Sequence, residues 1–151
     1  MDINEYKKII NFAIHSEMDA RDFYRAVSEK VTDAYLKTLF SDLAKEEEKH
    51  EKILRAILDH ENIRTYFKET RDYHVSETVE KPAVSANMKP ADAIALAMKN
   101  EEEAMELYTW LAQGCDDPEQ RRVFEDLAAM ERDHKFKMEN AFVDVAYPEA
   151  W

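Results

Sequence analysis

A four-residue pattern, Glu-x-x-His, occurs twice in this chain, first at Glu47 to His50 and again at Glu131 to His134, eighty-four residues later. Self-similarity at a fixed offset indicates two copies of one structural unit. The chain is therefore expected to fold as two related halves, each with its own Glu-x-x-His. The same offset also matches other residues: Leu43 with Leu127, Ala44 with Ala128, Glu17 with Glu101, Ala20 with Ala104 and Tyr24 with Tyr108.

Turn-forming residues are rare in this sequence. Its 151 residues include one glycine and four prolines, while 36% of the residues are charged and 45% are hydrophobic. So few helix breakers in a chain of this length predict long helices, in a single all-α domain with a sizeable core. That domain spans residues 1–151, and the predicted helices cover about residues 3–31, 34–67, 90–113 and 118–146.

The ends of the predicted helices carry capping signals. Asp2 with Glu5 three residues later is a capping-box pattern, which marks a helix start. Gly114 is a typical C-terminal cap, and it marks the end of the third helix. The candidate starting residues of the four helices are Asp2, Thr32 or Asp33, Pro90, and Asp117 followed by Pro118.

The connections between the helices predict the topology. The first and last pairs of helices are joined by short segments, so each pair is expected to form an antiparallel hairpin. The stretch between the pairs, about residues 68–89, is too long for a turn and fits a crossover along the outside of a bundle. Two hairpins joined by one long crossover form the ferritin-like four-helix bundle.

Glutamate and histidine interrupt the apolar stripes of these helices. Glu17 lies between Ala13 and Ala20 at helical spacing on the first helix, and Glu101 holds the matching position on the third. The two Glu-x-x-His pairs interrupt the stripes of the second and fourth helices in the same way. The six candidate metal ligands, which are also the predicted catalytic residues, are Glu17, Glu47, His50, Glu101, Glu131 and His134.

Neighbouring acidic residues are weaker candidates. Glu51, for example, corresponds to Lys135 in the second copy, so its chemistry is not kept. Glu102 remains an alternative to Glu101, because a small rotation of the third helix would exchange the two. Two other acidic pairs survive the offset but lie roughly 140–200° around their helices from the candidates and are expected to face solvent: Asp19 with Glu103 and Asp22 with Glu106.

Four carboxylates in a helical core need neutralising cations. A buried glutamate without a partner costs several kcal/mol, whereas two divalent ions balance four carboxylates and leave the imidazoles as neutral ligands. Carboxylate oxygens with one imidazole per ion suit iron, with manganese as the second choice and zinc as a possible substitute. The single Cys115 excludes a four-cysteine metal site. The alternative is a metal-free helical interaction module, in which removing Glu47 or Glu131 would be neutral or stabilising.

Tyr24 and Tyr108 lie two turns beyond the glutamates of the first and third helices. We expect each hydroxyl to bond a ligand carboxylate and so to tune the metals. The alternative is a core aromatic whose hydroxyl is satisfied elsewhere.

These motifs resemble those of the ferritin-like diiron carboxylate proteins, and among them the rubrerythrin family. The resemblance covers all four helices. It implies two iron ions bridged by Glu47 and Glu131, with Glu17 and Glu101 as terminal ligands. His50 and His134 would each hold one iron. It also implies reduction of hydrogen peroxide and assembly as a homodimer.

The sequence departs from the family pattern at two points. Rubrerythrins carry a rubredoxin domain with four cysteines, whereas this sequence has one cysteine, so the electron donor is expected to be external, such as a rubredoxin-like protein. The family also has an extra glutamate one turn beyond the ligand of the third helix, where this chain has Ala104. Glu103 or Glu106 would replace it only if that helix were rotated.

Charge and hydropathy limit the partners. The formal net charge is −12, which disfavours nucleic acid and anionic membrane surfaces as partners. No signal peptide or long apolar span is visible in the sequence, so a cytoplasmic location is the default expectation.

Two functions follow from these expectations. The first is a diiron peroxidase or oxidase that reduces hydrogen peroxide or dioxygen, with a role in oxidative stress. The second is a ferritin-like protein that oxidises, binds and stores ferrous iron.

Overall fold

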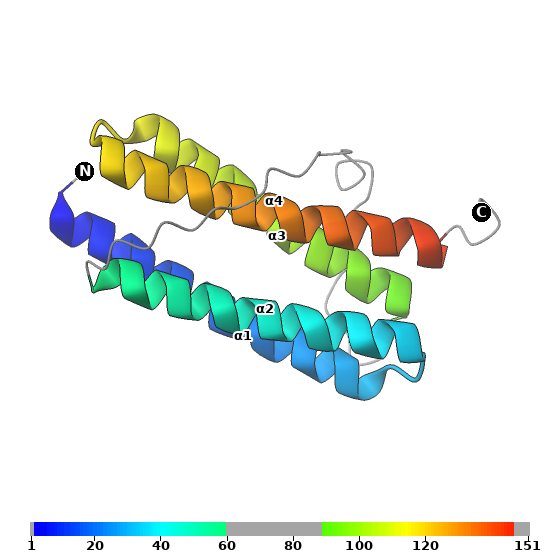
Figure 1. The fold of residues 1–151 in the computed structure, drawn as a ribbon. Coiled ribbons are helices and arrows are strands. Elements are labelled where there is room, and N and C mark those ends of the chain that lie inside the picture. Colours follow the sequence, from blue (N-terminus) through cyan, green and yellow to red (C-terminus); the bar gives the residue numbers. More distant parts are fainter. Residues whose placement is uncertain (1, 60–88, 147–151) are drawn as a thin grey trace. The chain divides into compact units, whose positions relative to one another are not determined.

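The computed structural model describes residues 2–59 and 89–146, and in these ranges the chain is almost wholly helical (Figure 1). The helices are α1 (Ile3–Lys30), α2 (Ala34–Leu58), α3 (Pro90–Gly114) and α4 (Pro118–Ala146). The chain divides into two compact units, one containing α1 and α2 and the other containing α3 and α4. We call these units hairpin 1 and hairpin 2.

Hairpin 1 begins at the predicted caps. The Asp2 carboxylate accepts a hydrogen bond from the backbone N–H of Asn4 at 2.6 Å, and the Asp33 carboxylate accepts one from Leu36 at 3.0 Å. These bonds satisfy backbone donors that a helix start leaves without an intrahelical partner. Helix α2 ends at Leu58, and the predicted continuation over residues 60–67 lies outside the described residues.

The two helices of hairpin 1 are antiparallel, as predicted. Arg21 on α1 contacts Glu51 on α2, and one turn further along α1, Arg25 contacts the earlier residue Glu48. Residue numbers therefore rise along one helix as they fall along the other. The connection between the helices is the short segment of residues 31–33, which has no room for any other pairing.

Hairpin 2 repeats this arrangement. The Asp117 carboxylate accepts hydrogen bonds from the backbone N–H groups of Glu119 at 2.9 Å and Gln120 at 3.0 Å, which places the start of α4 at the predicted residue. Pro90 occupies the first turn of α3, where its missing N–H costs nothing. Helices α3 and α4 pack on each other (Figure 1). The predicted crossover lies outside the described residues up to residue 88.

The end of α3 differs from the prediction by one residue. Gly114 is the last residue of the helix, and the cap is Cys115, with an extended backbone at φ −89° and ψ 124°. The backbone of Gly114 lies outside the left-handed region, so the glycine is not needed for its conformation. The Cys115 side chain is buried, with 2% of its surface exposed.

Each hairpin buries the stripe that its periodicity predicts. The buried apolar residues of hairpin 1 include Ile10, Ala13, Tyr24, Leu36, Phe40, Leu43 and Leu54, and those of hairpin 2 include Ile94, Ala97, Tyr108, Phe124, Leu127, Met138 and Ala141.

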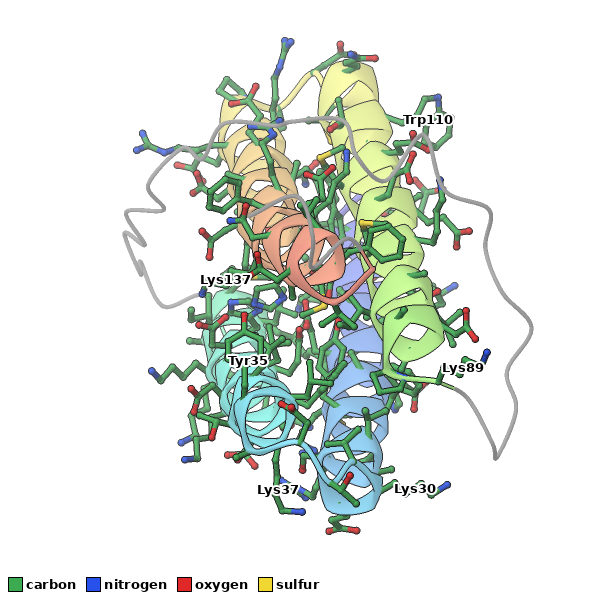
Figure 2. All side chains as sticks on the ribbon, turned by 90° about the vertical axis from the view of Figure 1, so that its right-hand side faces the viewer. Lys30, Tyr35, Lys37, Lys89, Trp110 and Lys137 are labelled. Atoms are coloured by element: carbon green, nitrogen blue, oxygen red, sulfur yellow. The ribbon has the colours of Figure 1, made fainter. Side chains whose placement is uncertain are left out.

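The remaining helix faces are predominantly polar. The exceptions include Trp110, which is 69% exposed and points away from α3 (Figure 2). Among the described residues, no helix combines the length and apolar character required to cross a membrane.

Candidate metal centre

In hairpin 1, three of the predicted ligands come together. The Nδ1 atom of His50 lies 3.8 Å from Oε2 of Glu17 and 3.6 Å from Oε2 of Glu47. The exposed fractions are 3% for Glu17, 1% for Glu47 and 8% for His50. We call these three residues the first donor set.

In hairpin 2, the corresponding residues also come together. The Nδ1 atom of His134 lies 3.4 Å from Oε1 of Glu101. Ligand atoms of Glu101, Glu131 and His134 all lie within 4.8 Å of one another. Their exposed fractions are 4%, 4% and 1%. These three residues form the second donor set.

Helix geometry explains why each donor set converges. A spacing of three residues is ~300° around an α-helix, so Glu47 and His50 share the face of α2 that also carries Leu43. The antiparallel partner helix then brings Glu17 opposite this face. The same spacing and the same partner geometry apply to α4 and α3 in hairpin 2.

The distances within both donor sets suit metal ligation. The carboxylate and imidazole atoms are 3.4–3.8 Å apart, which is longer than an ordinary hydrogen bond. Atoms that bind one ion at ~2.0–2.2 Å are separated by roughly this distance when they approach it from different sides. Two carboxylates and one imidazole per hairpin are also the donor types that iron and manganese accept.

The structure distinguishes Glu101 from its rival. Both Glu101 and Glu102 are buried, but Glu101 faces His134, whereas the Glu102 carboxylate forms an ion pair with Nζ of Lys99 at 3.1 Å. In hairpin 2, Glu101 is therefore the residue positioned beside the Glu-x-x-His pair.

The rotation of α3 also decides whether another acid can act beside Ala104. Glu103 and Glu106 are exposed, in agreement with the prediction that they face solvent. Because both side chains are exposed to solvent, neither can take the place of the glutamate that the rubrerythrin pattern has at the position of Ala104. This departure from the family pattern therefore remains in the folded protein.

Tyr24 and Tyr108 are both buried, with 1% and 4% of their surfaces exposed. The ring of Tyr24 packs against Phe23 and Phe40, with ring centroids 5.7 and 6.1 Å apart. These positions are compatible with the predicted bonds to ligand carboxylates, and those bonds remain a prediction.

Two buried charged residues of α4 were not identified from the sequence. Lys135 is fully buried, and Glu139, one turn later, is 1% exposed. The internal repeat carries a signal for this pair of residues. The offset of eighty-four relates Lys135 and Glu139 to Glu51 and Arg55, which form an ion pair on α2 with the acidic residue first and the basic residue second.

The chain is similar to proteins of one known family. The family model described as Rubrerythrin matches residues 8–141. The chain is also similar to a solved structure, described as a hypothetical protein from Pyrococcus furiosus. The two sequences are 28% identical, and the TM-score is 0.68. The match covers 93% of this chain and 90% of that chain. No curated protein matches significantly. The family match and the four helices confirm the predicted fold class, an all-α ferritin-like four-helix bundle. With nearly all of its described length matched, this chain belongs to the rubrerythrin family.

Proposed function

We propose that this protein is a non-haem diiron oxidoreductase that reduces hydrogen peroxide or dioxygen with electrons from an external donor. The observation that carries the proposal is the pair of buried donor sets, each with two glutamates and one histidine at matching positions of a duplicated hairpin. In the proposed centre each donor set would hold one divalent ion, and Glu47 and Glu131 would each contribute a carboxylate to holding the ions.

The residues present fit two divalent metal ions. Four ionised glutamates carry four negative charges, which two divalent ions neutralise, so that burial of the carboxylates no longer costs free energy. The histidines add neutral nitrogen ligands, and the described chain offers carboxylate and imidazole rather than thiolate donors at these positions. Iron is the proposed metal and manganese the second choice.

The protein residues have separate tasks in this proposal. Glu17 and Glu101 would each contribute one carboxylate ligand, and His50 and His134 would each contribute one imidazole ligand. Burial of all six side chains excludes bulk water and so limits loss of reactive oxygen species to solvent. When bound, the metal ions supply electrons to the oxidant, and an external protein such as a rubredoxin-like donor, or a small reductant, restores them.

The test has two stages. Protein purified without oxygen should contain about two iron or manganese ions per chain by elemental analysis. The iron-loaded protein should then consume many equivalents of hydrogen peroxide per chain when a reductant is supplied, and Glu47→Gln should lose both properties. Far fewer than two ions per chain after loading with ferrous iron would contradict the proposal and leave a metal-free helical module.

A second function, ferrous iron oxidation and storage, is favoured by one observation. Ala104 stands where the rubrerythrin pattern has an extra glutamate, and the exposed Glu103 and Glu106 do not replace it. A storage protein would accumulate iron well beyond two ions per chain and would show little turnover with a reductant. Iron content after prolonged aerobic loading, measured beside peroxide turnover, separates the two functions. Sedimentation would also distinguish the homodimer that the family resemblance implies from the larger assemblies of storage proteins.

A further inference from the structure

The first donor set is flanked by an ion-pair network between its two helices. The Nη1 atom of Arg21 on α1 lies 3.2 Å from Oε1 of Glu51 on α2. The other carboxylate oxygen of Glu51 accepts a hydrogen bond from Nε of Arg55 at 2.9 Å. Arg21 and Glu51 are only 20% and 19% exposed, so their interaction is less screened by water than an ordinary surface pair.

This network lies close to the first donor set along both helices. Arg21 lies one turn after Glu17 on α1, and Glu51 directly follows His50 on α2. The Arg21–Glu51 contact therefore holds the two ligand-bearing helices at one spacing and rotation before any ion is bound. Removal of groups that bond directly to metal ligands typically changes metal affinity by about 10–100-fold, and Arg21 would act through the position of its helix, so its effect belongs at the lower end of that range.

The positions of hairpin 2 that correspond to Arg21 and Glu51 carry residues of different chemistry. The offset of eighty-four residues places Met105 where hairpin 1 has Arg21 and Lys135 where it has Glu51. Met105 carries no charge, so it cannot form an ion pair with Lys135. Thr109 stands at the position that corresponds to Arg25. Its hydroxyl group donates a hydrogen bond to the backbone carbonyl of Met105 on the same helix at 2.8 Å.

Lys135 adds a second difference between the two donor sets. Its side chain is fully buried, and it lies one helical turn from Glu131 and directly after His134. A cationic lysine at this position would compete with a divalent ion for the negative charge of the second donor set. In hairpin 1 the equivalent residue, Glu51, is acidic and is neutralised by arginines outside the donor set.

We propose that the two donor sets bind metal unequally: the first ion binds Glu17, Glu47 and His50, with Arg21 as the positioning residue, and the second ion binds more weakly in hairpin 2. This inference rests on the proposed function, because it assumes that both donor sets are metal ligands. The inference adds an order of metal binding, with the ion of hairpin 1 bound before the ion of hairpin 2, although the two donor sets contain the same residue types.

The first experiment titrates the metal-free full-length protein with cobalt(II) in the absence of oxygen, followed by visible absorption and calorimetry. We expect two binding steps. His134→Ala should keep the tight step and lose the weak one, whereas His50→Ala should lose the tight step. The opposite assignment, or equal effects of the two variants, would overturn the inference while leaving the metal centre intact. Failure of the wild-type protein to bind any cobalt would instead overturn the proposed function as well.

The second experiment tests the positioning role. Arg21→Met, which copies Met105, should weaken the tight step about tenfold and leave the weak step unchanged. Arg121→Met is the matched control, because it removes an exposed ion pair with Glu125 on α4 and should change neither step. Lys135→Met should strengthen the weak step alone. Circular dichroism of each variant verifies the fold. A fall in melting temperature for Arg21→Met with both affinities unchanged would show a purely structural role and refute the positioning role.

Discussion

At the scale of single residues, burial of charge is the feature that most distinguishes this chain from an ordinary helical protein. The glutamates of the two donor sets are 1–4% exposed, although an ionised carboxylate is strongly stabilised by water. Such residues reduce the stability of the metal-free protein and are retained where they bind a cation. Their effect on stability should therefore change sign when metal is added.

Glu47→Gln tests this reversal. Because the substitution removes a buried charge, we expect it to raise the melting temperature of the metal-free protein by about 2–4 °C. Addition of ferrous iron under argon should raise the melting temperature of the wild-type protein by clearly more than that of the variant, since the variant keeps only the second donor set and binding stabilises only the state that binds. Differential scanning calorimetry with and without metal gives both values. A variant that gains as much as the wild type would argue against Glu47 as a ligand.

Asp126 makes a pH-dependent contribution to stability. Burial raises the pKa of its carboxyl group above the ordinary value of 3.8, opposed by the nearby Arg122 and reinforced by Glu125. The folded state therefore binds this proton more tightly than the unfolded state does. Stability from this group is present below pH 3.8 and is lost as the pH rises through the raised pKa.

Asp126→Asn should consequently raise the free energy of unfolding at pH 7, with the gain shrinking as the pH approaches 3.8. Urea unfolding of wild type and variant across pH 3.5–7.5 measures the difference. Asp42 occupies the equivalent position of α2 and is exposed, so Asp42→Asn serves as the control and should have little effect. A gain that grows toward low pH would contradict the assigned direction.

At the scale of the helices, local hydrogen bonds at the termini determine where each element begins. Asp117 satisfies two backbone N–H groups of the first turn of α4. We expect Asp117→Ala to lower the free energy of unfolding by about 1 kcal/mol, the usual cost of losing such a cap. The exposed neighbour Asp116 is the natural control, and Asp116→Ala should cost much less in the same urea titration. Equal losses would mean that charge near the helix start matters more than the cap.

Gly114 shows the opposite case, a residue without a conformational requirement. It lies in helical backbone, and a Cβ atom added there would meet no atom within 4 Å. Gly114→Ala should therefore stabilise the protein by roughly 0.4–1 kcal/mol, because alanine loses less backbone entropy on folding. Thermal unfolding measures the change, and a destabilised variant would show that the end of α3 needs a positive φ in solution.

At the scale of the whole molecule, each hairpin carries one donor set, so metal binding is expected to stabilise both hairpins. We expect amide hydrogen exchange to slow in all four helices when two ions are bound per chain. With one ion per chain, protection should be greater in α1 and α2 than in α3 and α4, because the first donor set is held in place by Arg21 and Glu51. Exchange measured by mass spectrometry at both loadings distinguishes the states. Protection that is equal in both hairpins at one ion would contradict unequal binding.

Much of this fold could be predicted from residue patterns, because the signals are local. Periodicity placed the buried stripes, and carboxylates before helix starts placed Asp2, Asp33 and Asp117 as caps. The internal repeat separated Glu17 and the Glu-x-x-His pairs from many other acids. The family match confirmed the fold class, whereas the roles of the six residues as ligands remain predictions.

The amino-acid sequence by itself determined the four helices, their pairing and the faces that carry the donor residues, since these depend on spacing within one helix and on short connections. Only the tertiary structure decided which residues of neighbouring helices meet. It turned Glu101 and not Glu102 toward His134, buried Lys135, and placed Arg21 against Glu51. The physical reason is that helical periodicity specifies angles around a single axis, whereas the rotation and spacing of two helices depend on the packing of all the side chains between them.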